Sequence, residues 1–301
     1  MLRIAFHPLY IHPLPEKHRF PMEKYELIYE QLLYAGIVDK MSFFEPKLAD
    51  RQTLEAVHDS GYVQHLFNLT LDPKMVRRIG FPLSKQLIDR ERYIADGTVQ
   101  SSLFALENGV SFNIAGGTHH AGRNYGDGFC MFNDQAVAAA FLLKNNLAKR
   151  VLIIDLDVHQ GDGTADIFQD RKDVFTLSIH CQNNYPFQKR NSTWDIGLED
   201  KTGDEEYLRI LDHALSNVFT EFRPDFVFFQ AGVDVLETDK LGKLSLSLEG
   251  CRQRDEIVFT TCFVHGVPVQ VSMGGGYSTQ IRDIVNAHTQ TYKTAIQIFN
   301  L

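Results

Sequence analysis

The chain has 301 residues, of which 44% are hydrophobic and 23% are charged. This composition is typical of a folded globular protein and excludes a mainly disordered chain. Lysine and arginine total 30 against 38 aspartate and glutamate residues, for a formal net charge of -8, so the sequence predicts no direct binding to nucleic acid.

The sequence shows no pattern typical of a membrane or secreted protein. No segment is long and apolar enough to predict a membrane span, and the apolar stretch at residues 1–8 is too short for a signal peptide. We therefore expect a soluble protein located in the cytoplasm. The four cysteines form no Cys-x-x-Cys pair, so we expect free thiols rather than disulfides or a thiolate metal site.

Short apolar runs alternate with longer helical patterns along the chain. The apolar runs are rich in β-branched and aromatic residues, which is typical of buried parallel strands. In chain order the sequence predicts helices at 22–36, 53–69 and 94–107, a strand at 111–117, a helix at 134–145, strands at 151–157 and 174–180, a helix at 204–222, a strand at 226–232, a helix at 248–265, a strand at 267–273 and a helix at 279–299. This alternation predicts one α/β domain over residues 1–301, with a mostly parallel sheet covered by helices on both faces.

Glycine, aspartate, histidine or tyrosine residues stand where each of the predicted strands ends. In open parallel α/β sheets, ligands bind outside the carboxyl ends of the strands. The sequence therefore predicts one functional site at that edge, built from residues 116–120, 155–159, 178–180, 232–234 and 274–277.

The segment at residues 154–164 carries the clearest chemical pattern. Asp155, Asp157 and His159 recur at a spacing of two, which places their side chains on one side of an extended backbone. Crowded buried carboxylates need a compensating cation, so we expect a divalent metal held by Asp157, His159 and a third ligand, Asp234. The alternative is that the carboxylates cap backbone amides or pair with basic side chains, and that His159 is a core histidine.

Two adjacent histidines follow a glycine pair at residues 116–117. His119 and His120 suit a general base and an electrostatic or acid partner, and Asp155 and Asp162 could orient them. Tyr277 follows three glycines and could donate its phenolic O–H to an oxygen that becomes anionic, although a tyrosine at a strand end is more often a packing residue.

These segments together resemble the histone deacetylase family of zinc-dependent amidohydrolases, which have the arginase-type α/β fold. The similar segments are residues 117–121, 128–134, 154–163, 231–234 and 274–277. Residues 18–25 and 234–247 look most like the class IV branch of the family.

The resemblance implies a role for each polar residue at the strand ends. Asp157, His159 and Asp234 would hold zinc, although two carboxylates and one imidazole also suit Fe(II). His120, oriented by Asp162, would act as general base and acid. The resemblance also implies that His119 pairs with Asp155 for electrostatic stabilisation and that Tyr277 hydrogen-bonds the substrate carbonyl.

The resemblance further implies a substrate tunnel and a second cation site. The tunnel would be formed by Gly128, Phe129, Tyr185, Leu241 and Gly275. A potassium ion behind the metal would be held by Asp155, Asp157, His159, Ser178 and Ile179. Arg19 matches a family arginine that lines an internal exit channel, and the alternative is a surface arginine.

The expected reaction is hydrolysis of an acetyl or longer acyl group from the side-chain amine of a lysine in a protein or peptide. The glycine-rich residues 114–117 and Gln160 depart from the common family pattern, and a glycine-rich pocket floor could admit longer acyl chains. The alternatives are an acetylpolyamine or other small acylated amine as substrate and, in a different class, a catalytically silent acyl-lysine-binding module.

The remaining histidines have no clustered partners in the sequence. We expect packing or surface roles for His7, His12, His58, His65, His213, His265 and His288. The basic run from Lys74 to Arg92 predicts a solvated helix face, or otherwise a loop beside the tunnel.

Overall fold

The structure, a computed structural model, describes residues 2–301. Its elements, with η for 3₁₀ helices, follow in the order β1 (Ile4–Ala5), η1 (Pro8–Tyr10), α1 (Lys24–Tyr34), η2 (Lys40–Ser42), β2 (Phe43–Phe44), α2 (Arg51–Leu54), α3 (Ser60–Phe67), α4 (Pro73–Ile79), α5 (Lys85–Asn108), β3 (Val110–Asn113), α6 (Asp134–Lys144), β4 (Val151–Asp155), α7 (Asp162–Phe168), β5 (Val174–Cys181), β6 (Trp194–Leu198), α8 (Asp204–Glu221), β7 (Phe226–Gln230), α9 (Leu248–His265), β8 (Val269–Ser272) and α10 (Ile281–Phe299). Within the described part of the chain, no helix has the length and apolar character needed to cross a membrane.

Eight strands form one sheet in the order β2-β1-β3-β8-β7-β4-β5-β6, and every neighbouring pair is parallel. The strands that the sequence predicts are β3, β8, β7, β4 and β5, which are neighbours and form the centre of the sheet. The sequence analysis missed β2 and β6, which are the two edge strands, and β1, which lies between β2 and β3. The prediction of a parallel α/β sheet is therefore confirmed, and the predicted number of strands is too small.

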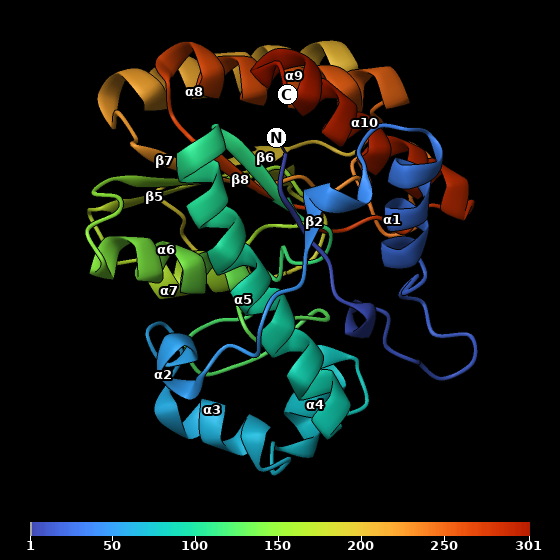
Figure 1. The fold of residues 1–301 in the computed structure, drawn as a ribbon, viewed down its shortest axis with the longest axis vertical. Coiled ribbons are helices and arrows are strands. Elements are labelled where there is room, and N and C mark those ends of the chain that lie inside the picture. The colour runs from blue at the N-terminus through green and yellow to red at the C-terminus, as the bar shows by residue number, and fades with distance from the viewer. Residues whose placement is uncertain (1) are drawn as a thin grey trace.

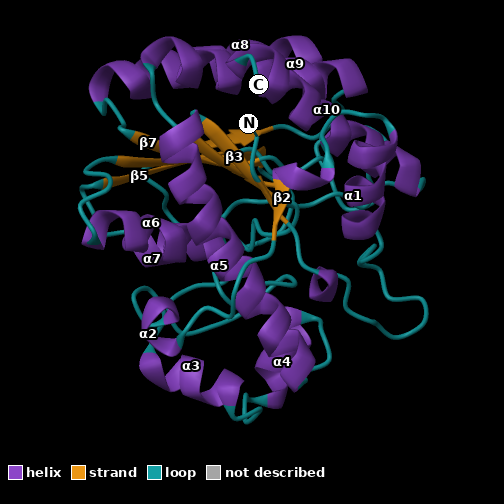
Figure 2. Ribbon diagram, viewed as in Figure 1, coloured by secondary structure: helices purple, strands orange, loops and turns teal. Residues whose placement is uncertain are grey.

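Helices cover both faces of this sheet (Figures 1 and 2). One face is covered by α8, α9 and α10, and the other by α5, α6 and α7, with α2, α3 and α4 beyond them. Every residue of β3, β4, β7 and β8 is buried, as expected for a parallel sheet with no solvent-exposed face.

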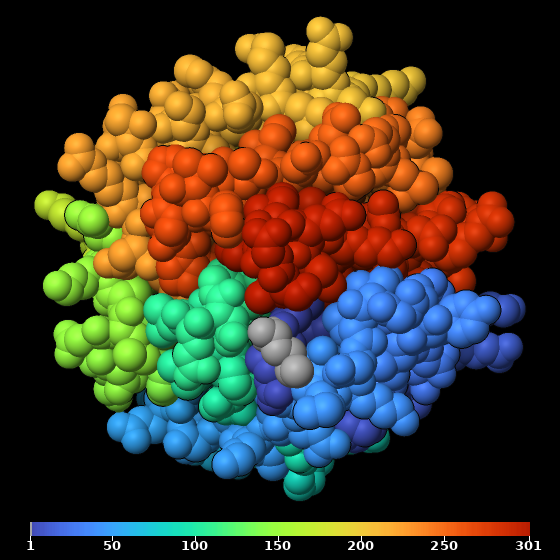
Figure 3. Space-filling model, turned by 45° about the horizontal axis from the view of Figure 1, so that its top comes forward, coloured from blue at the N-terminus to red at the C-terminus, as the bar shows by residue number. Residues whose placement is uncertain are grey.

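The two ends of the chain pack together. The C-terminal helix α10 contacts both α9 and α1, and Figure 3 shows its red surface between the orange surface of α9 and the blue N-terminal region. Because the N-terminal region packs against the C-terminal helix and β1 lies within the sheet, the chain forms a single domain.

One predicted helix is wrong in its extent. Residues 53–69 do not form one helix, because α2 ends at Leu54 and α3 begins at Ser60. The side chain of Asp59 accepts hydrogen bonds from the backbone N–H groups of Gly61 and Tyr62, so it starts a new helix there. The helix predicted at 94–107 likewise begins earlier, because Ser84 caps the first turn of α5 at Leu87.

The expectation of a solvated helix face between Lys74 and Arg92 is wrong for Arg90. This run covers α4 and the first turns of α5, and the Arg90 side chain is only 2% exposed. Its guanidinium pairs with Glu91 and donates to the backbone oxygen of Tyr10 at 2.9 Å. Arg90 therefore belongs to the interior, where a charge must be paired.

Candidate active site

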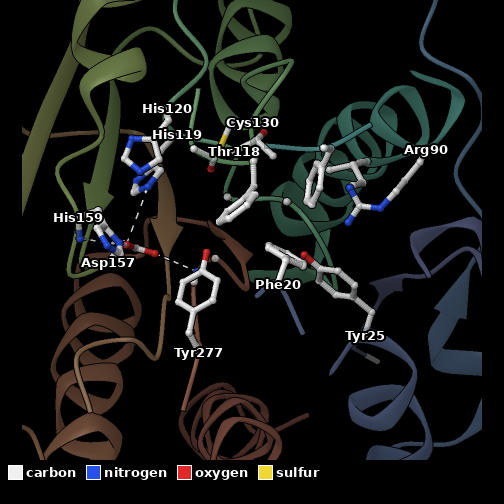
Figure 4. A pocket seen from close by; sticks show the side chains of 18 residues that line it. Phe20, Tyr25, Arg90, Thr118, His119, His120, Cys130, Asp157, His159 and Tyr277 are labelled. Atoms are coloured by element: carbon white, nitrogen blue, oxygen red, sulfur yellow. Dashed lines mark hydrogen bonds and ion pairs between the residues drawn. The ribbon is translucent and has the colours of Figure 1, made fainter. Parts of the chain in front are cut away.

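The polar residues predicted at the strand ends converge because their strands are neighbours in the sheet. The order β3-β8-β7-β4 places four carboxyl ends side by side. His119 and His120 follow β3, Asp157 follows β4, Asp234 follows β7 and Tyr277 follows β8. Figure 4 shows the two histidines, Asp157 and the phenolic end of Tyr277 gathered around one pocket.

Three of these residues form a group that could hold a metal ion. One ligand atom from each of Asp157, His159 and Asp234 lies within 4.8 Å of the others, and all three residues are buried. The His159 Nδ1 atom lies 3.0 Å from Asp157 Oδ1 and 3.2 Å from Asp234 Oδ2. The structure thus brings the three predicted ligands together from two separate strand ends.

The surroundings of this group fit a divalent cation. Asp234 Oδ1 accepts a hydrogen bond from the Val158 N–H, but the buried Asp234 Oδ2 has no hydrogen-bond partner in the described residues. Burial and the negative charge of Asp157 raise the pKa of Asp234 to about 7. Two buried carboxylates this close need positive charge between them. Gly275 permits the close approach, since a Cβ there would lie 2.0 Å from Asp234 Oδ2.

The two histidines have matching partners and opposite electrostatics. His119 Nδ1 donates to Asp155 at 2.7 Å, and His120 Nδ1 donates to Asp162 at 2.6 Å. Burial lowers the pKa of His119, but the charges of Asp155 and Asp157 outweigh this effect and raise the pKa to about 9. Burial and the charge of His119 lower the pKa of His120. At neutral pH His119 is therefore a cation, and His120 is a neutral imidazole that can accept a proton.

Tyr277 is held in place by Asp239, a residue that the sequence analysis missed. The Tyr277 N–H donates to Asp239 Oδ2 at 2.6 Å, and Asp239 Oδ1 accepts from the N–H groups of Leu241 and Gly242. Burial, together with the charges of nearby carboxylates, raises the pKa of Tyr277 well above its ordinary value. The phenol therefore keeps its proton and can donate a hydrogen bond into the pocket.

The predicted tunnel residues line two pockets that share His159 and Tyr277 in their walls. Gly128, Phe129, Tyr185 and Leu241 line the outer pocket, and Gly275 lines the inner pocket beside Tyr277. The inner pocket is narrow, with a cavity volume of about 40 Å³. Phe129 adopts a φ of 70°, which is rare for a bulky residue and occurs where the surroundings enforce it.

Arg19 does not lie in the interior. Its side chain is exposed at the outer mouth, with its guanidinium 5.0 Å from the centroid of the Phe129 ring. The arginine that lines the inner pocket is Arg90 of α5. Of the two alternatives for Arg19, the surface arginine is therefore the correct one, and the comparison with an internal channel residue is wrong.

The residues expected to hold a potassium ion lie behind the metal group. Asp155 of β4 is the register partner of Ser178 in β5, and Ile179 follows on the same strand. Asp155 Oδ1 accepts from the Asp157 N–H at 3.2 Å, and Ser178 Oγ is hydrogen-bonded to His180. The structure brings these groups together, and potassium itself stays a prediction.

Two further buried side chains hold the histidine turn. Asp134 accepts hydrogen bonds from the N–H and the hydroxyl of Thr118 at 2.8 and 2.7 Å. Gln230 donates to the backbone oxygen of Gly117 at 2.8 Å. Both were missed as site residues, although a glutamine that ends the apolar run Phe226–Gln230 is a signal that could have identified one of them.

Comparison with known proteins assigns the chain to a family. A family model described as the histone deacetylase domain matches residues 18–292. An uncharacterized protein from Picosynechococcus sp. is 44% identical over 296 residues, which cover 98% of this chain and 99% of that protein. Histone deacetylase 2 from Arabidopsis thaliana is 30% identical over 269 residues, which cover 86% of this chain and 70% of that protein.

Longer relatives and solved structures agree with this assignment. Histone deacetylase 1 from Homo sapiens is 30% identical over 304 residues, which cover 93% of this chain and 61% of that protein. A crystal structure of an HDAC homolog complexed with SAHA superposes with a TM-score of 0.83 at 25% identity, covering 99% of this chain and 84% of that one. The HDA15 HD domain shares the fold, with a TM-score of 0.80 at 22% identity and coverages of 99% and 92%. The chain belongs to the histone deacetylase family of hydrolytic deacetylases.

Proposed function

We propose that this chain is a zinc-dependent deacetylase that removes an acetyl group from the side-chain amine of a lysine in a protein or peptide. The observation that carries this proposal is the buried group of Asp157, His159 and Asp234 in the pocket that also holds a neutral His120 and a protonated Tyr277. A silent binding module would not need all of these groups in one pocket.

Each side chain has a defined task in this reaction. Asp157, His159 and Asp234 would hold a divalent ion, which supplies polarisation of the amide carbonyl and a lowered pKa for water. His120, fixed by its hydrogen bond to Asp162, accepts a proton from the attacking water and later returns it to the leaving amine.

Two further side chains stabilise the negative charge that develops on the carbonyl oxygen. Tyr277 donates its phenolic O–H to that oxygen. His119, kept cationic by Asp155 and Asp157, adds positive charge beside His120. The centroids of the two imidazole rings lie 4.1 Å apart.

The size of the inner pocket favours an acetyl group over a long acyl chain. The inner pocket is narrow, with a cavity volume of about 40 Å³. An acetyl group fits such a space, whereas a myristoyl chain requires the inner wall to repack. The longer acyl chain suggested by the glycine-rich residues 114–117 is therefore the less favoured substrate.

The charge of the outer mouth favours a peptide over an acetylpolyamine. The mouth is lined by the basic side chains of Arg19, Arg78 and Lys243. Arg78 is paired with Asp127 and Lys243 lies 3.8 Å from Asp200, so that, among the described residues, the positive charge left at the mouth is that of Arg19. A polyamine carries several positive charges, so this mouth repels it, while a peptide can present neutral or acidic neighbours.

The remaining proposals concern the metal, the subfamily and the location. Two carboxylates and one imidazole suit zinc best and Fe(II) second. Residues 18–25 and 234–247 support a place in the class IV branch, and the composition supports a cytoplasmic location. Potassium bound near Asp155 and Ser178 would appear as higher activity in potassium than in sodium buffer.

The test is an acyl-substrate profile on one metal-analysed preparation. We expect the acetyl-lysine peptide to be hydrolysed faster than the myristoyl-lysine peptide or an acetylpolyamine, with about one zinc per chain. The Asp234→Asn variant serves as the control and should lose both the metal and the turnover. A metal-loaded wild-type protein that hydrolyses no acyl amide would overturn the proposal.

A further inference from the structure

Lys24 is a fully buried lysine beside the active site. It is the first residue of α1, its relative exposure is 0%, and its Nζ atom donates to the backbone oxygen of Gly274 at 2.8 Å. The ammonium also lies over three aromatic rings, at 5.1 Å from the centroid of Phe20, 5.4 Å from Tyr25 and 5.6 Å from Tyr277. Within residues 2–301, no carboxylate oxygen lies within ion-pair distance of it.

Burying an ammonium without a paired carboxylate is costly. A leucine or methionine could fill the same volume without that cost, so packing alone does not explain a lysine here. Burial lowers the pKa of Lys24 to about 8, against the opposing charges of Asp234, Asp157 and Asp239. At neutral pH the side chain is therefore still charged.

Within residues 2–301, the Lys24 side chain makes one hydrogen bond, and it reaches the segment that positions Tyr277. Residues 274–276 are three consecutive glycines, which have no side chains to fix their conformation. The segment is held by backbone contacts, among them the Gly275 N–H to Asp157 at 2.9 Å, and at its far end by Asp239. Lys24 is the side chain that holds its near end, through the oxygen of Gly274.

The contact with the Tyr277 ring gives the charge a second effect. A cation over an aromatic face is attracted to that face, which favours one orientation of the ring. The same positive charge lies next to the phenol of Tyr277. In the proposed reaction the oxygen of this phenol faces the substrate carbonyl oxygen, on which negative charge develops. Lys24 therefore acts on Tyr277 from both its backbone and its ring.

We propose that Lys24 is a positioning residue of the deacetylation reaction, which fixes the Gly274 carbonyl and the ring of Tyr277 so that the phenol meets the carbonyl oxygen of the substrate. This inference rests on the proposed function. It also makes the first turn of α1 and the residues just before it part of the active site, because Tyr25 and Phe20 line the same inner pocket.

The first experiment compares the purified, metal-loaded Lys24→Met variant with wild type on an acetyl-lysine peptide. We expect kcat to fall about 10- to 100-fold, as for a displaced catalytic group, while KM and metal content change little. The matched control is Lys172→Met, an exposed lysine after α7, which should leave kcat unchanged. An unchanged kcat in Lys24→Met, or a loss confined to KM, would overturn the inference.

A double-mutant cycle separates positioning of Tyr277 from general damage. If Lys24 acts through Tyr277, adding Lys24→Met to Tyr277→Phe should cost less than about threefold more, since the two effects are not independent. If Lys24→Met lowers kcat by the same factor in the wild-type protein and in Tyr277→Phe, the inference is refuted. If Lys24→Met does not fold, Lys24→Leu, which also removes both the N–H donor and the charge, is measured against the same expectations.

Hydrogen–deuterium exchange of the metal-free protein gives a readout that does not depend on activity. We expect faster exchange of the backbone amides at residues 274–280 in Lys24→Met, and wild-type exchange in Lys172→Met. Unchanged exchange there would contradict the anchoring role of Lys24. Should the wild-type protein hydrolyse no acyl amide, the proposed function fails, and the exchange result still decides whether Lys24 holds the segment.

Discussion

Two adjacent histidines acquire different chemistry from the charges around them. His119 lies near two carboxylates, Asp155 and Asp157, and its pKa rises, whereas His120 has one partner, Asp162, and faces the cation of His119. In the proposed reaction the same side chain thus serves once as a fixed positive charge and once as a base. The division of roles follows from surroundings that lie 36 and 42 residues away in sequence.

Removing the partner of His120 should affect both rate and pH dependence. We expect Asp162→Asn to lower kcat about 10²- to 10⁴-fold, because the imidazole loses its orienting acceptor. His120 must be neutral to act as a base, so activity falls as the pH drops below its pKa, which burial places below the ordinary 6.5. Asp162 raises that pKa, so the acid limb of kcat/KM should move to lower pH in the variant.

The control for this experiment is an aspartate that lies two residues beyond the end of the same helix. Asp170, just after the far end of α7, is exposed, and Asp170→Asn should keep the wild-type pH profile. A pH-rate profile of Asp162→Asn that matches wild type in both height and acid limb would contradict the role of His120.

Tyr277 should be needed for turnover and not for metal binding. We expect Tyr277→Phe to lower kcat about 10²- to 10³-fold, the usual effect of removing one donor to a developing oxyanion. The metal ligands do not include the phenol, so elemental analysis should find the wild-type metal content. A rate near that of wild type on the acetyl-lysine peptide would exclude Tyr277 as the donor.

The sequence points to the side chains that we propose to react more clearly than to those that we propose to position them. Asp157, His159 and Tyr277 are conspicuous because polar residues interrupt or follow apolar strand runs. Lys24 and Asp239 stand among other polar residues, and only the packing of α1 and of the loop before Leu241 brings them to Tyr277. A positioning role depends on contacts between distant segments, which residue spacing does not encode.

At the scale of elements, the centre of the sheet is easier to predict than its edges. Central strands such as β4 and β7 are buried on both faces and form continuous apolar runs. The edge strand β2 has two half-buried residues, and most of β6 is half-buried or exposed. Edge strands therefore lack the apolar run on which prediction depends.

A buried histidine links the helical elements and should make stability depend on pH. His58, between α2 and α3, donates from Nδ1 to the Gly122 oxygen and accepts at Nε2 from the Asn133 N–H, both at 2.9 Å. Burial lowers its pKa from 6.5 to about 4. Between these values the unfolded chain takes up the proton and the folded one does not, so stability is lost as the pH falls below 6.5.

Urea unfolding at about pH 7 and pH 4.5 measures this contribution. Wild type should lose roughly 2 to 3 kcal/mol from His58 over this interval, in addition to the contributions of other groups. Over the same pH interval, His58→Gln should lose less unfolding free energy than wild type by that amount. His265→Gln, at an exposed site in the last turn of α9, should lose as much as wild type. Equal pH dependence in all three proteins would refute the assignment.

At the scale of the whole molecule, the site exists only in the folded chain. Its side chains come from positions between Phe20 and Tyr277 and meet only when the central strands are in register and α1 is packed on α10. A ligand that binds this site binds the folded state alone and stabilises it by mass action. Metal binding and unfolding of the domain should therefore be coupled.

Zinc added to the metal-free protein should raise the Tm of the entire domain. At a free zinc concentration 100 times Kd, the expected gain is about 2.7 kcal/mol, which corresponds to several degrees for a chain of this size at roughly 2–4 °C per kcal/mol. Asp234→Asn should lose this zinc-dependent increase. Calorimetry over a zinc titration checks both expectations, and an equal zinc-dependent shift in Asp234→Asn would show that the stabilising ion binds elsewhere.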